Sequence, residues 1–97
     1  MSSYMLLCNF TDQGVRTIKD AAKRRKAARE MAKKLGVEIT TGYLAIGPYD
    51  LVIQAEAPHD ETLATYLLSL ASKGNVRTTT LKVFAEAEFD KIIAKVA

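Results

Sequence analysis

The sequence predicts an α+β fold in which helices cover one face of a single antiparallel sheet. Four segments are rich in β-branched and aromatic residues, and turn residues such as Gly, Pro and Asp follow three of them. Between these segments, two stretches carry apolar residues at intervals of three and four, which is the spacing of an amphipathic helix. The 97 residues are enough for one domain, 1–97, and too few for two.

The order of the elements defines the fold further. We expect strands over residues 4–10, 37–46, 49–57 and 76–84. We expect helices over residues 15–35, 59–73 and 86–96. Thr11 or Asp12 caps the first helix, and Gly36 and Gly74 end the first and second helices. Strand, helix, strand, strand, helix, strand is the order of the ferredoxin-like fold with a four-stranded antiparallel sheet, here followed by an extra helix.

The first strand is apolar on both of its faces. One face carries Met5 and Leu7, and the other carries Tyr4, Leu6, Cys8 and Phe10. Burying a Leu or Met side chain is worth roughly 1.5–3 kcal/mol, so a hydrated second face would forgo several kcal/mol in a small domain. We therefore expect a homo-oligomer, in which two sheets pack face to face about a twofold axis or edges join in a ring. The alternative is that the final helix folds over this face.

The same reasoning predicts a place for a ligand. We expect the second face to mix Met5, Leu7, Asn9, Gln54, Thr78 and Thr80. Such a face lines either a small pocket for an organic ligand or a polar interface between subunits, and the interface is favoured. Asn75, Arg77 and Thr78 have the donors that hold an anion, although Arg77 more simply pairs with an acidic neighbour or with a partner subunit.

Four short motifs carry a family resemblance. They are Thr11-Asp12-Gln13-Gly14, Ile18-Lys19-Asp20, Gly47-Pro48-Tyr49-Asp50 and Gly74-Asn75-Val76-Arg77-Thr78. In this order they resemble the GYD-domain family, which is named for the residues that are Gly47, Tyr49 and Asp50 here. The resemblance spans residues 4 to about 89. It implies a ferredoxin-like fold akin to the dimeric α+β barrels, a superfamily of oligomeric pockets with varied chemistry, and the family's own function is largely uncharacterised.

The chain departs from the family pattern in its first helix. In many relatives a Ser/Thr-Pro pair follows the Lys-Asp and breaks the helix, whereas this chain has Ala21-Ala22. We therefore expect a straighter helix here. The basic residue that normally follows the break corresponds to Arg24.

Tyr49 and Asp50 have two interpretations. A phenol and a carboxylate at a pocket rim form a usable acid–base pair. A tight turn whose Asp bonds to its own backbone is the simpler interpretation, and we favour it. The only histidine, His59, stands at a helix start, where an exposed structural role is expected.

Charge is distributed unevenly along the chain. The net charge is +3, yet the segment 16–34 holds nine basic residues against two acidic ones. Its candidate basic surface consists of Lys23, Arg24, Arg25, Lys26 and Arg29. The total charge is small and no aromatic residue interleaves with this cluster, so a solvated helix face is favoured over a nucleic-acid site. Arg25 falls on the apolar stripe and is expected to reach a subunit interface.

Several functional classes find no support in the sequence. The single cysteine, Cys8, lies in an apolar strand and is expected to behave as a small hydrophobic residue. No His/Cys cluster, phosphate-binding glycine loop or dinucleotide fingerprint is present, so we expect no metal and no cofactor. The longest apolar run, 5–8, is too short to cross a bilayer, and the N-terminus does not read as a signal peptide. We expect a cytoplasmic location and no membrane partner.

The function expected from these observations is that of a homo-oligomeric, cofactor-free binding or interaction module, with a small organic ligand between sheet and helices as an added expectation. Whether it is an enzyme stays open. The alternative is a small oxygenase or isomerase of the dimeric α+β barrel kind that uses Asn9, Tyr49, Asp50 and Arg77. A third hypothesis is nucleic-acid or anionic-partner binding through the basic first helix.

Overall fold

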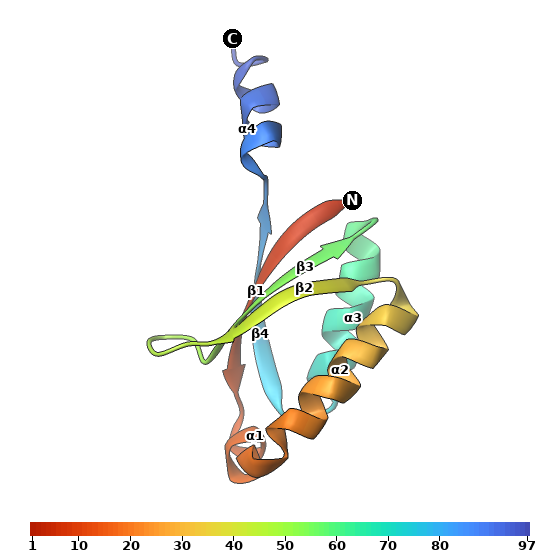
Figure 1. The fold of residues 1–97 in the computed structure, drawn as a ribbon, viewed down its shortest axis with the longest axis vertical. Helices are drawn as coiled ribbons and strands as arrows, with labels where there is room; N and C mark the ends of the chain where they lie inside the picture. Colours follow the sequence, from red (N-terminus) through yellow and green to blue (C-terminus); the bar gives the residue numbers. More distant parts are fainter.

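The computed structural model describes all 97 residues and contains one four-stranded antiparallel sheet in the order β2-β3-β1-β4 (Figure 1). The strands are β1 (Ser2–Phe10), β2 (Glu38–Leu44), β3 (Leu51–Ala57) and β4 (Val76–Val83). The helices are α1 (Asp12–Arg16), α2 (Ala21–Leu35), α3 (Asp60–Ser72) and α4 (Glu86–Ile93), with a 3₁₀ turn η1 (Ile18–Asp20) between α1 and α2. This arrangement confirms the α+β, ferredoxin-like fold.

The core lies between the sheet and the helices α2 and α3, which lie on the same side of the sheet (Figure 1). Leu6, in the middle of β1, is fully buried, and it is paired with Ile53 of β3 and Thr80 of β4. The buried cluster consists of Tyr4, Leu6, Cys8, Ala32, Val37, Ala55, Ala57, Leu63 and Tyr66. The first strand was predicted to turn Tyr4, Leu6, Cys8 and Phe10 to one face. Tyr4, Leu6 and Cys8 are buried in the core, so the prediction is confirmed for these three.

The first helix is broken, and the expectation of a straight helix over residues 15–35 is wrong. Thr17 lies between α1 and η1 with φ −107° and ψ 29°, outside the helical region. Its backbone N–H and its hydroxyl both donate to the carbonyl of Gln13, at 3.2 and 2.9 Å, and close the last turn of α1. Replacing Ser/Thr-Pro by Ala21-Ala22 therefore does not straighten this helix, because the break lies before that pair.

The other boundaries follow the sequence closely. Gly36 ends α2 with φ 87°, and Gly74 follows α3 with φ 82°, as the left-handed stops predicted for them require. The strands β2 and β3 form the predicted hairpin, with a bulge between Ile39 and Thr41. The strand ends differ from the expected ones by only a few residues, which is the usual uncertainty of element ends.

The helix α4 does not fold over the sheet. It continues beyond the end of β4 and projects away from the rest of the chain, as Figure 1 shows. The sheet face opposite α2 and α3 is therefore not covered by any segment of this chain, and the alternative in which the last helix covers it is not observed. No helix has the length and apolar character needed to cross a membrane.

Candidate functional site

The uncovered sheet face, here called the open face, carries apolar and polar side chains mixed within each row across the strands. The central row carries Tyr43, Val52, Leu7 and Thr79 across the four strands. The adjacent row carries Thr41, Gln54, Met5 and Leu81. Leu81 is 48% exposed, and Met5 and Leu7 are half-buried. The prediction that Met5 and Leu7 occupy the face away from the helices is thus confirmed.

The predicted pocket residues divide between the two faces of the sheet. Asn9 is paired with Arg77, and both belong to the open face together with Gln54. Thr78 and Thr80 are paired with Cys8 and Leu6, which places them on the helix-covered face. The structure therefore does not bring the two threonines together with Asn9, Gln54 and Arg77. The register of β4 explains the difference. Side chains along a strand alternate between the two faces, so a shift of one residue relative to the predicted pairing moves each threonine to the other face.

Asp50 connects the β2–β3 turn to the first strand. Its backbone N–H donates to the carbonyl of Cys8 at 2.9 Å, and its carboxylate Oδ2 accepts the backbone N–H of Phe10 at the same distance. The carboxylate thus extends the ladder between β1 and β3 by one bond. The interpretation of Asp50 as a structural turn residue is supported, although its partner is the backbone of Phe10 rather than its own.

Tyr49 lies among turn residues and is partly exposed. Its hydroxyl makes no hydrogen bond within the chain. Asp50 lies at the same end of the sheet as Asn9 and Arg77, since its two hydrogen bonds reach the residues on either side of Asn9. Of the residues predicted for acid–base chemistry, the fold therefore brings Asn9, Asp50 and Arg77 to the same end of the sheet. His59, at the start of α3, is exposed and makes no cap hydrogen bond with its side chain.

The motif at residues 11–14 joins two loops. The Thr11 hydroxyl donates to the Gly74 carbonyl at 2.5 Å, and the Gln13 amide donates to the Lys73 carbonyl at 3.1 Å. Gly14 is buried against the backbone of Asn75, and a Cβ at this position would lie 2.2 Å from the Asn75 carbonyl oxygen. These residues hold the start of α1 against the α3–β4 turn, so their role is structural.

A cleft of about 750 Å³ lies on the other side of the sheet, between the sheet and α2. Its sheet wall includes Phe10, Ile39 and Ile53, and its helix wall includes Ala21 and Ala28. The small alanine side chains leave room that larger apolar residues would fill. Sequence reasoning placed a ligand between sheet and helices but named none of these residues, and the signal that was available is the alanine-rich inner stripe of α2.

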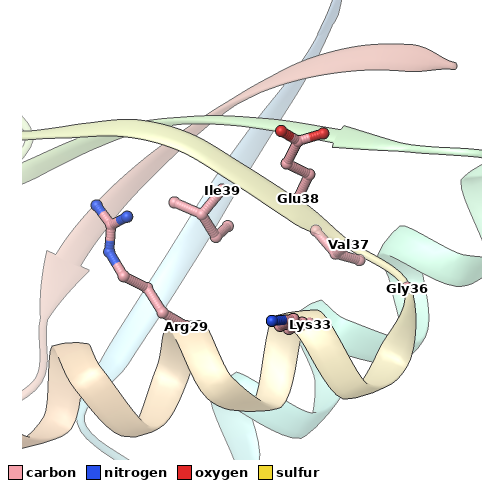
Figure 2. Close-up of a pocket in the computed structure, with 6 residues that line it drawn as sticks. All are labelled: Arg29, Lys33, Gly36, Val37, Glu38 and Ile39. Carbon is pink, nitrogen blue, oxygen red and sulfur yellow. The ribbon is translucent and has the colours of Figure 1, made fainter.

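The cleft continues into a second hollow of about 460 Å³ between the end of α2 and the start of β2 (Figure 2). Arg29 extends from α2 toward β2, and Ile39 points from β2 toward the helix, as Figure 2 shows. Both residues line the cleft and the hollow, so the two form one groove. We call this the α2–β2 groove. Lys33 adds a second positive charge to its rim.

The candidate basic surface is divided by this groove. Arg24, Arg25 and Arg29 line the cleft, whereas Lys23 and Lys26 do not. Arg24 is engaged in local structure, because its guanidinium donates to the carbonyls of Thr17 at 2.7 Å and Gly14 at 3.0 Å. It therefore caps the Gly14 carbonyl, a free acceptor in the last turn of α1. Arg25 and Arg29 keep their charge at the groove, in agreement with the sequence-based placement of Arg25 on the apolar stripe.

Tyr4, Asp60 and Lys82 form a cluster of ionisable groups outside the groove. The Tyr4 hydroxyl donates to Asp60 Oδ1 at 2.5 Å, and Lys82 Nζ lies 3.2 Å from the same oxygen. Hydrogen bonds from Tyr4 and Lys82 lower the pKa of Asp60, and burial raises the pKa of Tyr4. Burial also raises the pKa of the Cys8 thiol to about 11, as expected for a small hydrophobic residue and not for a reactive thiolate.

The fold and the two surfaces define a class of protein: a small ferredoxin-like α+β domain with one open sheet face and a groove beneath its helices. The sequence profile of the GYD domain matches residues 4–93. The chain belongs to the GYD domain family.

Known proteins support this assignment. A protein of Thermus thermophilus named glutamine synthetase and cystathionine β-lyase binding protein is 34% identical to this chain over 89 residues, which are 91% of this chain and 94% of that protein. The crystal structure of TTHA0845, also from Thermus thermophilus, matches with a TM-score of 0.58 and 25% identity, over 88% of this chain and 95% of that one. A hypothetical protein of Pyrococcus horikoshii, PHS023, has the same fold, with a TM-score of 0.56 at 18% identity over 89% and 93% of the two chains.

Proposed function

We propose that this chain is a protein-binding module that acts as a homodimer, in which the open faces of two copies pack together. The observation that carries the proposal is the apolar content of the open face, where Met5, Leu7 and Val52 sit beside the half-exposed Leu81. An uncovered patch of this kind marks an interaction surface. The polar residues among them, such as Asn9 and Gln54, supply hydrogen bonds that fix the orientation of a partner.

The two free sheet edges favour one orientation of the dimer. The strands β2 and β4 form the edges of the sheet, and each presents unpaired backbone groups. A twofold axis that runs along the strands brings β4 of one copy beside β2 of the other. These edges are then antiparallel, so the two sheets can close into one barrel and leave no edge free.

A monomer–dimer measurement tests this proposal directly. Sedimentation equilibrium of the chain at micromolar concentration is expected to give twice the monomer mass. Dilution is expected to shift the population toward the monomer with a single dissociation constant. A monomer at every concentration up to the micromolar range would contradict the homodimer.

The protein partner is proposed from charge and from the Thermus thermophilus relative. That relative is named for binding glutamine synthetase and cystathionine β-lyase. In this chain, Lys23 and Lys26 are exposed on α2 and make no ion pair within the chain. We propose that this helix surface binds an acidic patch on an enzyme of one of these two kinds, with a rate and affinity that fall as salt rises.

Binding to the two purified enzymes tests the partner. We expect surface-immobilised chain to bind glutamine synthetase or cystathionine β-lyase from its own source, with weaker binding at about 0.5 M than at about 0.05 M NaCl. Lys23→Glu with Lys26→Glu is expected to weaken binding about tenfold, whereas Lys95→Glu in the tail leaves it unchanged. Binding of neither enzyme, or equal binding by both variants, would contradict this assignment.

A second candidate function, which requires the α2–β2 groove to be free of any protein segment, is the binding of a small molecule in that groove. Its apolar walls and basic rim fit a small organic anion, since ligand sites combine apolar walls with a few polar groups. Mass spectrometry under native conditions is expected to show a retained mass that is lost on denaturation. Arg29→Ala is expected to release it, and an unliganded wild-type chain would remove this candidate.

A further inference from the structure

The helix α4 lacks any packing partner in its own chain. Every residue from 84 to 97 is exposed. The helix has eight residues and no side-chain cap, and isolated helices shorter than about 12–15 residues are marginal in water. Its apolar side chains nevertheless recur at helical spacing and remain open to solvent: Phe89 (56% exposed), Ile92 (46%) and Ile93 (51%), followed just past the helix end by Val96 (71%). This helix therefore needs a surface to pack on.

We propose that α4 of each copy packs into the α2–β2 groove of the second copy in the dimer. The inference rests on the proposed homodimer and adds an exchanged element to it. The groove offers apolar walls that include Ile39 and Ile53 and a rim formed by Arg29 and Lys33, and Figure 2 shows Ile39, Arg29 and Lys33. An amphipathic helix that lays its apolar stripe into an apolar groove is a common mode of recognition.

The register of the sheet places the two elements at the same level. Glu38, Glu56, Ser3 and Val83 form one row across the four strands, from β2 at one edge to β4 at the other. The helix α4 begins three residues after Val83, and Glu38 is one of the residues that line the hollow in Figure 2. Within one chain these two points lie at opposite edges of the sheet.

The proposed twofold axis brings them together. Rotation about an axis along the strands keeps each end of the sheet at its own level and exchanges the β2 and β4 edges. The point where β4 leaves the sheet then lies beside the start of β2 in the second copy. The helix α4, which extends beyond the sheet in the single copy, turns back at residues 84–85 to lie in the second copy's groove, whereas its own groove lies across the full width of the sheet.

Charge is complementary between the helix and the groove. The α4 helix carries Glu86, Glu88 and Asp90, and the groove carries Arg25, Arg29 and Lys33. The single salt bridge of the chain joins Lys82 to Asp60, so none of these six charges is paired within one copy. Opposite charges across the interface fix the direction in which the helix lies.

Hydrogen exchange tests the seating of α4 in the full-length protein. We expect the amides of residues 89–93 to be protected at concentrations where the protein is dimeric and to lose that protection on dilution to the monomer. Amides in a fully dimeric sample that exchange as fast as in an unfolded peptide would overturn the inference while leaving the dimer itself intact.

Substitutions in α4 provide a second test. Phe89→Ser and Ile92→Ser are each expected to raise the dissociation constant of the dimer about tenfold or more, because they remove buried anchors. Lys91→Ser is the matched control on the polar side of the same helix and is expected to stay within about twofold of the wild type. All these side chains are exposed in the single chain, so the fold, followed by circular dichroism, is retained. Dimers of the Phe89 and Ile92 variants that are as tight as the wild type would contradict the exchange.

A covalent cross-link identifies the contact itself. Chains with Lys33→Cys and chains with Ile92→Cys, mixed and oxidised, are expected to form a disulfide-linked heterodimer on a non-reducing gel. The pair Leu68→Cys and Ile92→Cys is the control, since Leu68 lies exposed on α3, away from the groove. Equal cross-linking of the two pairs, or of neither, would overturn the placement of α4.

Discussion

Gly14 shows how a single missing side chain allows two loops to meet. A Cβ here would lie 2.2 Å from the Asn75 carbonyl oxygen and 3.1 Å from its carbon, and backbone atoms cannot move aside cheaply. We expect Gly14→Ala to lower the free energy of unfolding by about 1–3 kcal/mol, the usual cost of overpacking, despite alanine's better helix propensity. Urea unfolding at neutral pH measures it.

Gly42 provides the matched control for this prediction. A Cβ at Gly42 would meet its nearest neighbour, Ile53 Cγ1, at 3.7 Å, which is ordinary contact. Gly42→Ala is therefore expected to change stability by less than about 0.5 kcal/mol. Equal losses for the two variants would show that the close approach to Asn75 is not what requires glycine at position 14.

Cys8 makes stability depend on alkaline pH. Burial raises its pKa to about 11 from an ordinary value near 9, so the folded chain holds the thiol proton more tightly than the unfolded chain. This contribution is complete below about pH 9 and is lost as pH rises toward 11. Each pKa unit corresponds to about 1.36 kcal/mol, so the wild type is expected to lose about 2 kcal/mol more than Cys8→Ala between about pH 8 and pH 10.5.

Urea unfolding at both pH values and one protein concentration checks the Cys8 prediction. Burial also raises the pKa values of Tyr4 and Tyr66, which adds a loss at higher pH that wild type and variant share, apart from the smaller rise in the Tyr66 pKa that comes from Cys8 itself. Parallel pH profiles for the two proteins would contradict the assignment to Cys8. Rapid labelling of the thiol in the folded protein would contradict it independently.

Among the elements, the break between α1 and α2 depends on one long side chain. Arg24 donates to the carbonyl of Gly14, which no backbone N–H reaches, and to the carbonyl of Thr17, which also accepts the N–H of Asp20. We expect Arg24→Ala to lower the free energy of unfolding by about 1–2 kcal/mol, since two hydrogen bonds from a charged donor are lost and the Gly14 carbonyl is left without a partner. The exposed neighbour Lys23 is the control, and Lys23→Ala is expected to be nearly neutral. A loss no larger than that of Lys23→Ala would show that α1 is held by its contacts with the α3–β4 turn alone.

At the scale of the whole molecule, the open face is expected to determine the oligomeric state. Leu7 lies in the central row of this face, where a charge would be buried without a partner in the proposed dimer. Leu7→Lys is therefore expected to raise the dissociation constant by more than about a hundredfold and leave a folded monomer. Sedimentation equilibrium measures this. Leu68→Lys, on the exposed side of α3, is expected to remain dimeric, and loss of the dimer in both variants would contradict a specific role for the open face.

The sequence predicted the apolar residues of the open face better than the polar ones. Met5 and Leu7 could be assigned to the second face because alternation along β1 is unambiguous once Leu6 is placed inside. The prediction that Thr78 and Thr80 lie on the second face was wrong, because three consecutive threonines give no hydropathy difference between the two sides. Their placement follows from the pairing of Asn9 with Arg77, a contact between distant segments.

The sequence by itself determined the order of the strands and helices, the helix ends at Gly36 and Gly74, and the apolar second face of β1, because each of these depends on neighbours within a few residues. Only the tertiary structure decided the break at Thr17, the α2–β2 groove and the direction of α4. The break needs Arg24 to reach back across a turn, the groove depends on the gap left by alanines facing Ile53, and α4 points outward because nothing in its own chain covers it. These features arise from contacts between segments, which the local pattern of residues does not encode.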